Sequence, residues 1–518
     1  MSTQAEKAYD RVSAHFEQAR AALAHELAER VPRPIDTLEI AAVIESIGIT
    51  DAVAEEDYGV ASSFDLAELV FPLVHHHALE RFFVDHEPDD PQILQREAES
   101  TRLDASVRGV LALVPLALLL IALHALAAAG WSSSLVLSLG LGVTAAMVLT
   151  SGPLVAIGRR TSIYIGFGYR TSARQFLILS SLVTFIACAV IAAAILGVSS
   201  ALGLFDLSQR WIFAVSLLGY ALLWLLAAGV LMAGFPIRVT ASLTTGLVVG
   251  FAVGTEVGSA AAGLGVGYAV SIGALTVSFA TAYRLTDHTR ALRLPSAGLA
   301  SLEAAPYVAF GSLFALLLLE PHVLGWLGQS DQDQLSILAT LELSFTLALP
   351  PILLASGAHE HTMHSFWVFV RVCQRTCDQR IFSRRVAAFH WREFRRYAAV
   401  LGALSVAMVI GCELVFLSGG LADLSQIVFL CAIAGFFLLG LGQFNCLLML
   451  SLAPPRRAIE SLLAGVVVLS VLGIPLAFVD FRLAALGFAL GAGAFAAAAV
   501  WNCRGMLGEV DYYYATAF

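Results

Sequence analysis

The chain has 518 residues, of which 58% are apolar and only 13% are charged, and its mean hydropathy is +0.80. About a quarter of the residues of an ordinary soluble domain are charged, so this composition excludes a soluble globular protein and indicates a membrane protein. The net charge of −9 is unevenly distributed: residues 1–105 hold 22 acidic and 8 basic side chains, whereas the remainder holds 17 and 22.

The acidic beginning of the chain predicts a small helical module in water, over residues 1–87. In "DTLEIAAVIESIG", Asp36 can cap a helix, Glu39 follows three residues later, and Gly48 ends the segment, which is a capping-box pattern. The segment 88–107, which includes "EPDDPQ", is expected to be a linker.

Apolar stretches of about 20 residues recur from Arg108 to the C-terminus, each long enough to cross a bilayer as a helix. The expected fold class is therefore an all-α polytopic membrane protein with about twelve transmembrane helices. The spans are predicted at 108–130, 133–157, 175–197, 211–234, 241–256, 260–283, 300–320, 335–356, 397–418, 424–449, 457–479 and 483–502. Only "EVGSA" separates the fifth span from the sixth.

Basic residues between the spans gather on one side of the membrane. Loops on the side of the N-terminus hold most of the arginines, and the opposite loops hold only Arg210 and Arg482. By the positive-inside rule, this asymmetry predicts a multi-pass membrane protein with both termini in the cytoplasm.

The second span ends in "LTSGPLVAIGRR". Pro153 removes a backbone donor and Gly152 loosens the helix, so a bend or break is expected close to Ser151. Such an interruption is tolerated where the freed carbonyls face protein or a water-filled cavity. The stretch therefore predicts a kink beside the cytoplasmic mouth of a cargo pathway, with Arg159 and Arg160 as head-group anchors or a docking site.

Ionisable residues inside predicted spans are costly, and they usually face a cavity or a partner. Glu303 lies in the inner half of its span, and Glu256, Glu320, Glu342 and Glu413 lie toward outer ends. An acidic outer vestibule and an interfacial placement, with the carboxylates reaching water, are both open. Glu303, Glu342 and Glu413 remain cargo-pathway candidates.

Tyrosines within the spans are further candidates for cargo contacts. The candidates of this kind are Tyr220, Tyr268 and Tyr307.

Glycines in the fifth span predict close helix packing. Gly246, Gly250, Gly254 and Gly258 recur every four residues, so they line one helix face that another helix can approach closely.

Residues 357–396, between the eighth and ninth spans, are rich in arginine and aromatic residues. Their apolar positions follow helical spacing, which predicts an amphipathic helix on the inner leaflet with its arginines toward lipid phosphates. The arginines expected to anchor or dock here are Arg371, Arg375, Arg384 and Arg385.

The sequence holds no motif for chemistry. It lacks a P-loop, a serine nucleophile elbow and an HExxH motif, and its seven cysteines show neither a disulfide framework nor a zinc-ligand spacing. We therefore expect no enzyme activity, no catalytic residue, no cofactor, no metal and no nucleic-acid partner.

Four stretches carry a family resemblance. "SLGLGVTAAMVLTSGPLVAIGRRTSIYIGFGYRTSA" (138–173) resembles the end of the second span in the Pel-type exopolysaccharide transporters, a family of the multidrug/oligosaccharidyl-lipid/polysaccharide (MOP) flippase superfamily. The stretches 219–250 and 336–371 are similar to that family's fourth and fifth spans and to its eighth span, and "EVDYYYATAF" (509–518) is similar to its tyrosine-rich end. The acidic module is a departure from the family, and so is "LLLLEPH" at the end of the seventh span.

The resemblance implies two six-helix bundles around a central cavity, at 108–283 and 300–518, joined by a cytoplasmic linker at 284–299. It also implies export of an exopolysaccharide cargo, with a cytoplasmic glycosyltransferase and other membrane subunits as partners besides the membrane lipids. One alternative is a flippase or antiporter of the same fold for small molecules or lipid-linked oligosaccharides. Another is a membrane scaffold that transports nothing, since few charges in mid-span fit an exporter and a scaffold equally well.

Overall fold

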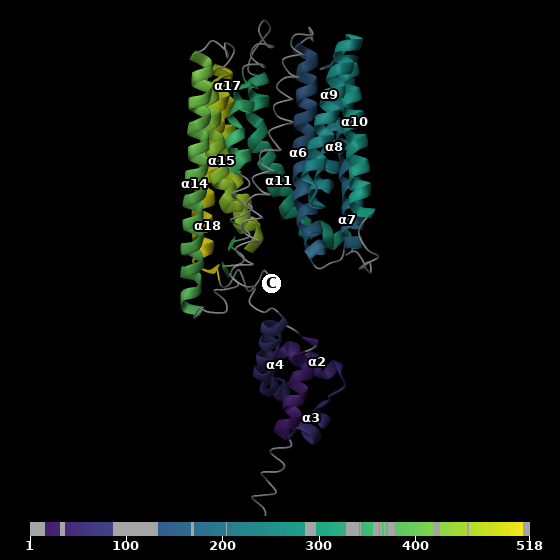
Figure 1. Ribbon diagram of the computed structural model, residues 1–518, viewed down its shortest axis with the longest axis vertical. Helices are drawn as coiled ribbons and strands as arrows, with labels where there is room; N and C mark the ends of the chain where they lie inside the picture. The colour runs from purple at the N-terminus through teal and green to yellow at the C-terminus, as the bar shows by residue number, and fades with distance from the viewer. Residues whose placement is uncertain are drawn as a thin grey trace, which may run out of the picture. The chain divides into compact units, whose positions relative to one another are not determined.

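The chain folds as two compact units, Met1–Glu99 and Ser100–Phe518. The computed structural model describes residues 16–28, 30–31, 37–85, 133–166, 170–203, 205–284, 297–327, 341, 343–355, 362, 365–366, 369–370, 379–417, 425–452 and 455–510 (Figure 1). Within these residues the structure is helical and contains no strand, which confirms the all-α polytopic fold class.

The first unit is a small helical module with its own apolar core. A helix over residues 16–28 precedes α2 (Thr37–Ser46), α3 (Asp51–Tyr58) and α4 (Ser63–Asp85). Leu27, Ile44 and Leu66 are completely buried between these helices. Gly48 follows α2 with a φ of 90°, the left-handed conformation expected of the residue that ends a helix, whereas Asp36 lies outside the described residues.

The second unit holds the long apolar helices. They are α6 (Ser133–Gly166), α7 (Arg170–Ala201), α8 (Leu207–Met232), α9 (Pro236–Val257), α10 (Ala260–Arg284), α11 (Ala297–Leu327), α14 (Gln379–Leu417), α15 (Gln426–Leu452), α16 (Arg456–Val468), η1 (Leu469–Gly473), α17 (Ile474–Val479) and α18 (Leu483–Leu507).

In the described part of the chain, ten stretches are long and apolar enough to cross a membrane. The predicted first span, 108–130, lies outside the described residues, and the predicted eighth is represented by the shorter apolar helix Leu343–Ala355. The close fifth and sixth spans are two separate helices, because Gly258 ends α9 in the left-handed conformation with a φ of 61°.

The long helices of the second unit form two groups. Figure 1 shows α6 to α10 together, α14 to α18 together, and α11 between them. The first half of α11 packs on α6, where Gly311 meets Gly152. Its second half packs on the other group, where Leu317 and Leu324 reach Gly465 and Gly473. Helix α11 therefore connects the two groups.

Two predictions about where helices are interrupted need correction. The predicted break at Pro153 does not occur, because α6 continues as one helix through it, and the alternative of a bend there stays a prediction. Residues 379–396 do not form a separate surface helix, since α14 runs without interruption from Gln379 into the ninth span and ends at Leu417.

Glycines bring several helices into close contact. A Cβ atom on Gly250 would lie 2.6 Å from the carbonyl oxygen of Gly263, and one on Gly263 would lie 2.8 Å from the Cα of Gly254. Gly246 likewise faces Gly267 of α10. Gly258 does not belong to this face, because it ends the helix and has no atom within 4 Å of its Cβ position.

Candidate functional site at the junction of the helix groups

Helix α6 of the first group crosses the connecting helix α11 at close range. A Cβ on Gly311 would lie 2.6 Å from the carbonyl oxygen of Ser151 and 2.8 Å from the Cα of Gly152. A Cβ on Gly152 would in turn overlap the carbonyl oxygen of Val308 and the hydroxyl of Ser312. The Ser-Gly-Pro stretch therefore faces protein, and its small residues let two backbones meet.

About two turns further along α6, Arg159 reaches across to both α11 and α15. Its Nη1 donates a hydrogen bond of 2.5 Å to the carbonyl oxygen of Leu450, and its guanidinium carbon lies 4.5 Å from the centre of the Tyr307 ring. Leu450 lies in the last turn of α15, where backbone carbonyls lack a partner within the helix. A cation there also interacts favourably with the negative end of the helix dipole. Arg159 of one group therefore caps a helix of the other.

The neighbouring Arg160 makes a second connection to α11. Its Nη1 forms an ion pair of 2.5 Å with Glu303, and its Nε lies 3.4 Å from the hydroxyl of Tyr164. The side chains of Arg160 and Glu303 are 32% and 49% exposed, so solvent screens this pair strongly. We call Arg159, Arg160, Glu303, Tyr307 and the Leu450 carbonyl the junction cluster.

The structure brings only some of the predicted pathway residues to this junction. Ser151, Gly152, Glu303 and Tyr307 gather at the α6–α11 contact, where Pro153 also lies in α6.

The predicted pathway residues Tyr220, Tyr268 and Glu413 do not take part in the junction. Tyr220 of α8 stacks on Trp224 at 6.2 Å, and Tyr268 of α10 lies against Gly219, both inside the first group. Glu413 of α14 accepts a hydrogen bond from Gln426, and Glu342 lies outside the described residues.

The acidic residues expected to form an outer vestibule do not contact one another among the described residues. Glu320 of α11 is the most enclosed of them, and it accepts a hydrogen bond of 2.8 Å from Ser470. Ser470 lies in η1, a π-helical turn that precedes Pro475, whose ring nitrogen has no hydrogen to donate. Glu256 is exposed on α9. The acids therefore have separate environments.

The predicted basic anchors also separate. Arg159 and Arg160 belong to the junction, whereas Arg384 and Arg385 lie on the exposed face of α14. Arg371 and Arg375 lie outside the described residues. Within the described residues, no group of three or more histidine, cysteine or acidic side chains could hold a metal ion.

Sequence reasoning missed Leu450 and Gly311. The Arg159–Leu450 hydrogen bond joins residues 291 positions apart, and its acceptor is a backbone carbonyl, which no residue type marks. Gly311 was available as a small residue in the seventh span, but nothing in the sequence indicates that its partner is Gly152.

Known proteins were compared with the chain by sequence and by structure. No family model and no curated protein matches it. A MOP superfamily transporter from Pyrococcus furiosus superposes with a TM-score of 0.55 and 12% identity, covering 80% of this chain and 97% of that chain. The outward-facing conformation of a multidrug resistance MATE family transporter gives 0.51 and 11%, covering 79% and 96%. The chain has the fold of the MOP superfamily transporters.

Each interaction of the junction cluster joins an arginine of α6 to a group on α11 or α15. None of these interactions is part of the backbone hydrogen bonding within a helix.

Proposed function

We propose that the chain exports an exopolysaccharide across the cell inner membrane, moving the polymer between its two helix groups, with both termini in the cytoplasm. The observation that carries this proposal is the junction cluster. In it, side-chain contacts from Arg159 of α6 join the first group to α11 and to the last turn of α15. Opening and resealing this junction would expose the space between the groups to one side of the membrane at a time.

The choice of a polysaccharide as cargo rests on the sequence and on the chemistry of the junction. The stretch that includes Ser151 and Gly152 resembles the Pel-type transporters, and Tyr307 supplies an aromatic ring for sugar stacking. A neutral polymer needs aromatic rings, hydroxyls and amides more than it needs charge. A cytoplasmic glycosyltransferase would make the polymer, with other membrane subunits completing the assembly, and this chain would have no catalytic role.

The test compares polymer inside and outside cells that express the glycosyltransferase with the wild-type chain, with Arg159→Gln, or with neither. Arg482→Gln is the matched control, because it removes an exposed arginine that the sequence places in a loop on the opposite side of the membrane. We expect external polymer to require the chain, to fall in Arg159→Gln, and to remain normal in Arg482→Gln. Export that continues without the chain would refute the proposal. Proton-driven transport of a small cation by the purified chain alone would favour an antiporter.

A further inference from the structure

The exposed face of α14 changes from arginine to apolar side chains within about one turn. Arg392, Arg395 and Arg396 are exposed on this face. The large exposed side chains that follow along the helix are all apolar: Val400, Val406, Ile410 and Leu414. Such a change on one continuous face marks where a helix leaves the hydrocarbon of a membrane.

With the membrane edge at Tyr397, where the predicted ninth span begins, the depth of these arginines follows from the rise of the helix. Residues 397–417 rise by about 31 Å, which matches the roughly 30 Å of bilayer hydrocarbon. Arg392 to Arg396 then stand about 2–8 Å beyond its edge, in the head-group layer. Arg384, on the same helix, stands about 20 Å beyond the edge, outside that layer.

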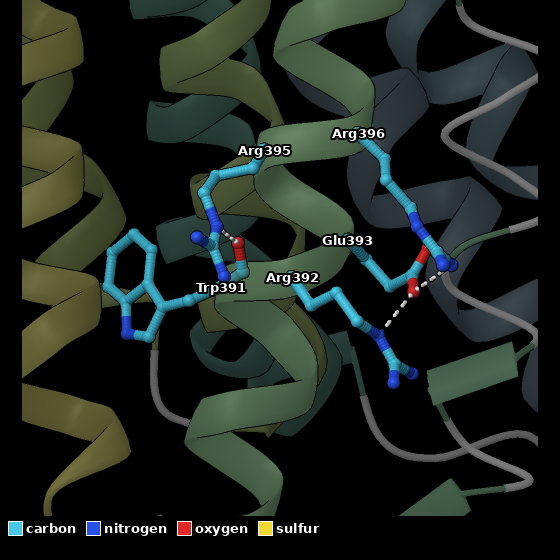
Figure 2. Close-up of polar contacts among 5 residues, drawn as sticks. All are labelled: Trp391, Arg392, Glu393, Arg395 and Arg396. Carbon is cyan, nitrogen blue, oxygen red and sulfur yellow. Dashed lines mark hydrogen bonds and ion pairs between the residues drawn. The ribbon is translucent and has the colours of Figure 1, made fainter.

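Figure 2 shows Arg392 and Arg396 on one side of the helix, where both contact Glu393, and Arg395 on the other side. Glu393, whose side chain is 13% exposed, accepts from Arg392 at 3.2 Å and from Arg396 at 2.7 Å. Arg395 points the other way, toward Trp391, and its Nε donates to that residue's carbonyl oxygen at 3.3 Å. The cluster holds three cations and one carboxylate, so it keeps an excess of positive charge.

We propose that Arg392, Arg395 and Arg396 form a binding site for the phosphodiester head group of an anionic phospholipid. Phosphate oxygens accept charge-assisted hydrogen bonds from the guanidinium groups. The acyl chains run along the apolar continuation of the same face, which begins at Val400. Trp391 lies at the depth where indole rings anchor helices at the membrane surface.

The apolar continuation identifies the ligand as a lipid. A free phosphate would gain only the arginine contacts, whereas a phospholipid also covers Val406 and Ile410, one and a half to three turns further into the membrane. The site therefore requires the phosphate and the acyl chains together.

The test measures binding of phosphatidylglycerol, phosphatidylcholine and inorganic phosphate to the purified full-length chain in detergent, by native mass spectrometry. We expect the wild-type protein to prefer phosphatidylglycerol over phosphatidylcholine. Replacing Arg392, Arg395 and Arg396 together by glutamine should lower phosphatidylglycerol affinity by about ten- to a hundredfold. The matched control Arg384→Gln, which removes an arginine of the same helix outside the head-group layer, should leave the affinity unchanged.

Two single variants keep the test decisive if the triple variant does not fold. Arg395→Gln breaks no ion pair and should lower affinity several-fold, whereas Glu393→Gln should raise it, because the carboxylate no longer neutralises Arg392 and Arg396. An unchanged affinity in Arg395→Gln, or an equal loss in Arg384→Gln, would overturn the proposal. Displacement of the lipid by equimolar inorganic phosphate would also overturn it.

Discussion

Replacing Arg159 by glutamine should release the junction between the two helix groups. Glutamine is too short to reach the Leu450 carbonyl, and it carries no charge to place over Tyr307. A charge-assisted hydrogen bond contributes about 1.5–3 kcal/mol, and a cation–π contact contributes about 0.5–2 kcal/mol. We expect a combined loss of about 2–4 kcal/mol, which shifts the balance between closed and open junctions by roughly 30- to 1,000-fold.

Pulsed electron paramagnetic resonance in lipid nanodiscs measures this shift directly. Spin labels at Ile163 and Arg456 would report the separation of the two groups, in a background without native cysteines. Both positions are exposed, Ile163 in the last turn of α6 and Arg456 at the start of α16. The wild-type protein should show a narrow distribution of distances, and Arg159→Gln should add a population at longer distances.

The adjacent arginine is the matched control. Arg160→Gln removes a half-exposed ion pair with Glu303, which is worth only about 0.2–1 kcal/mol, so the balance should move by less than about sixfold. Equal opening in both variants would refute the role given to Arg159, and so would an unchanged distribution in Arg159→Gln.

Two further predictions concern packing. Gly152→Ala should lower the free energy of unfolding by about 1–3 kcal/mol, because its Cβ would overlap α11, whereas Gly273→Ala, with no atom within 4 Å, should not. Their melting temperatures in detergent compare the two, and equal melting temperatures would contradict the tight crossing. In the second group, the buried His390 lies 3.1 Å from the side-chain oxygen of Asn445. Asn445→Leu alone should cost about 1–3 kcal/mol, because it leaves the Nε2 of the imidazole with only the Cys503 sulfur, at 3.5 Å, beside it. The double variant with His390→Phe should cost less than the two single losses together. Additive losses in the same melting assay would show that the two side chains are not coupled.

The sequence was sufficient to predict the fold class and most of the spans, because hydrocarbon demands long apolar helices. It was less informative where a helix continues beyond the membrane. In α14, the change from arginines to apolar residues near Tyr397 predicts a helix boundary, yet the helix continues through it. Composition marks the membrane edge, and a helix end requires a cap or a breaker.

Only the part of the candidate site that α6 contributes could be predicted from the sequence. Residues 151–153 and the two arginines after them were identified from composition and position along the second span. Their partners on α11 and α15 come from distant parts of the chain, and contacts over such separations leave no local pattern. Gly258 shows a similar limit, since its spacing of four matches a packing face although its left-handed backbone ends the helix.

Reversible cross-linking of the junction tests the central proposal most directly. Cysteines in place of Arg160 and Glu303, both accessible and on opposite helices, would be joined by a short bifunctional reagent that a reducing agent cleaves. If the polymer passes between the helix groups, its appearance outside the cells should stop after cross-linking and resume after reduction. Export that continues at the uncross-linked rate, with the helices shown to be joined, would contradict the account and favour a scaffold.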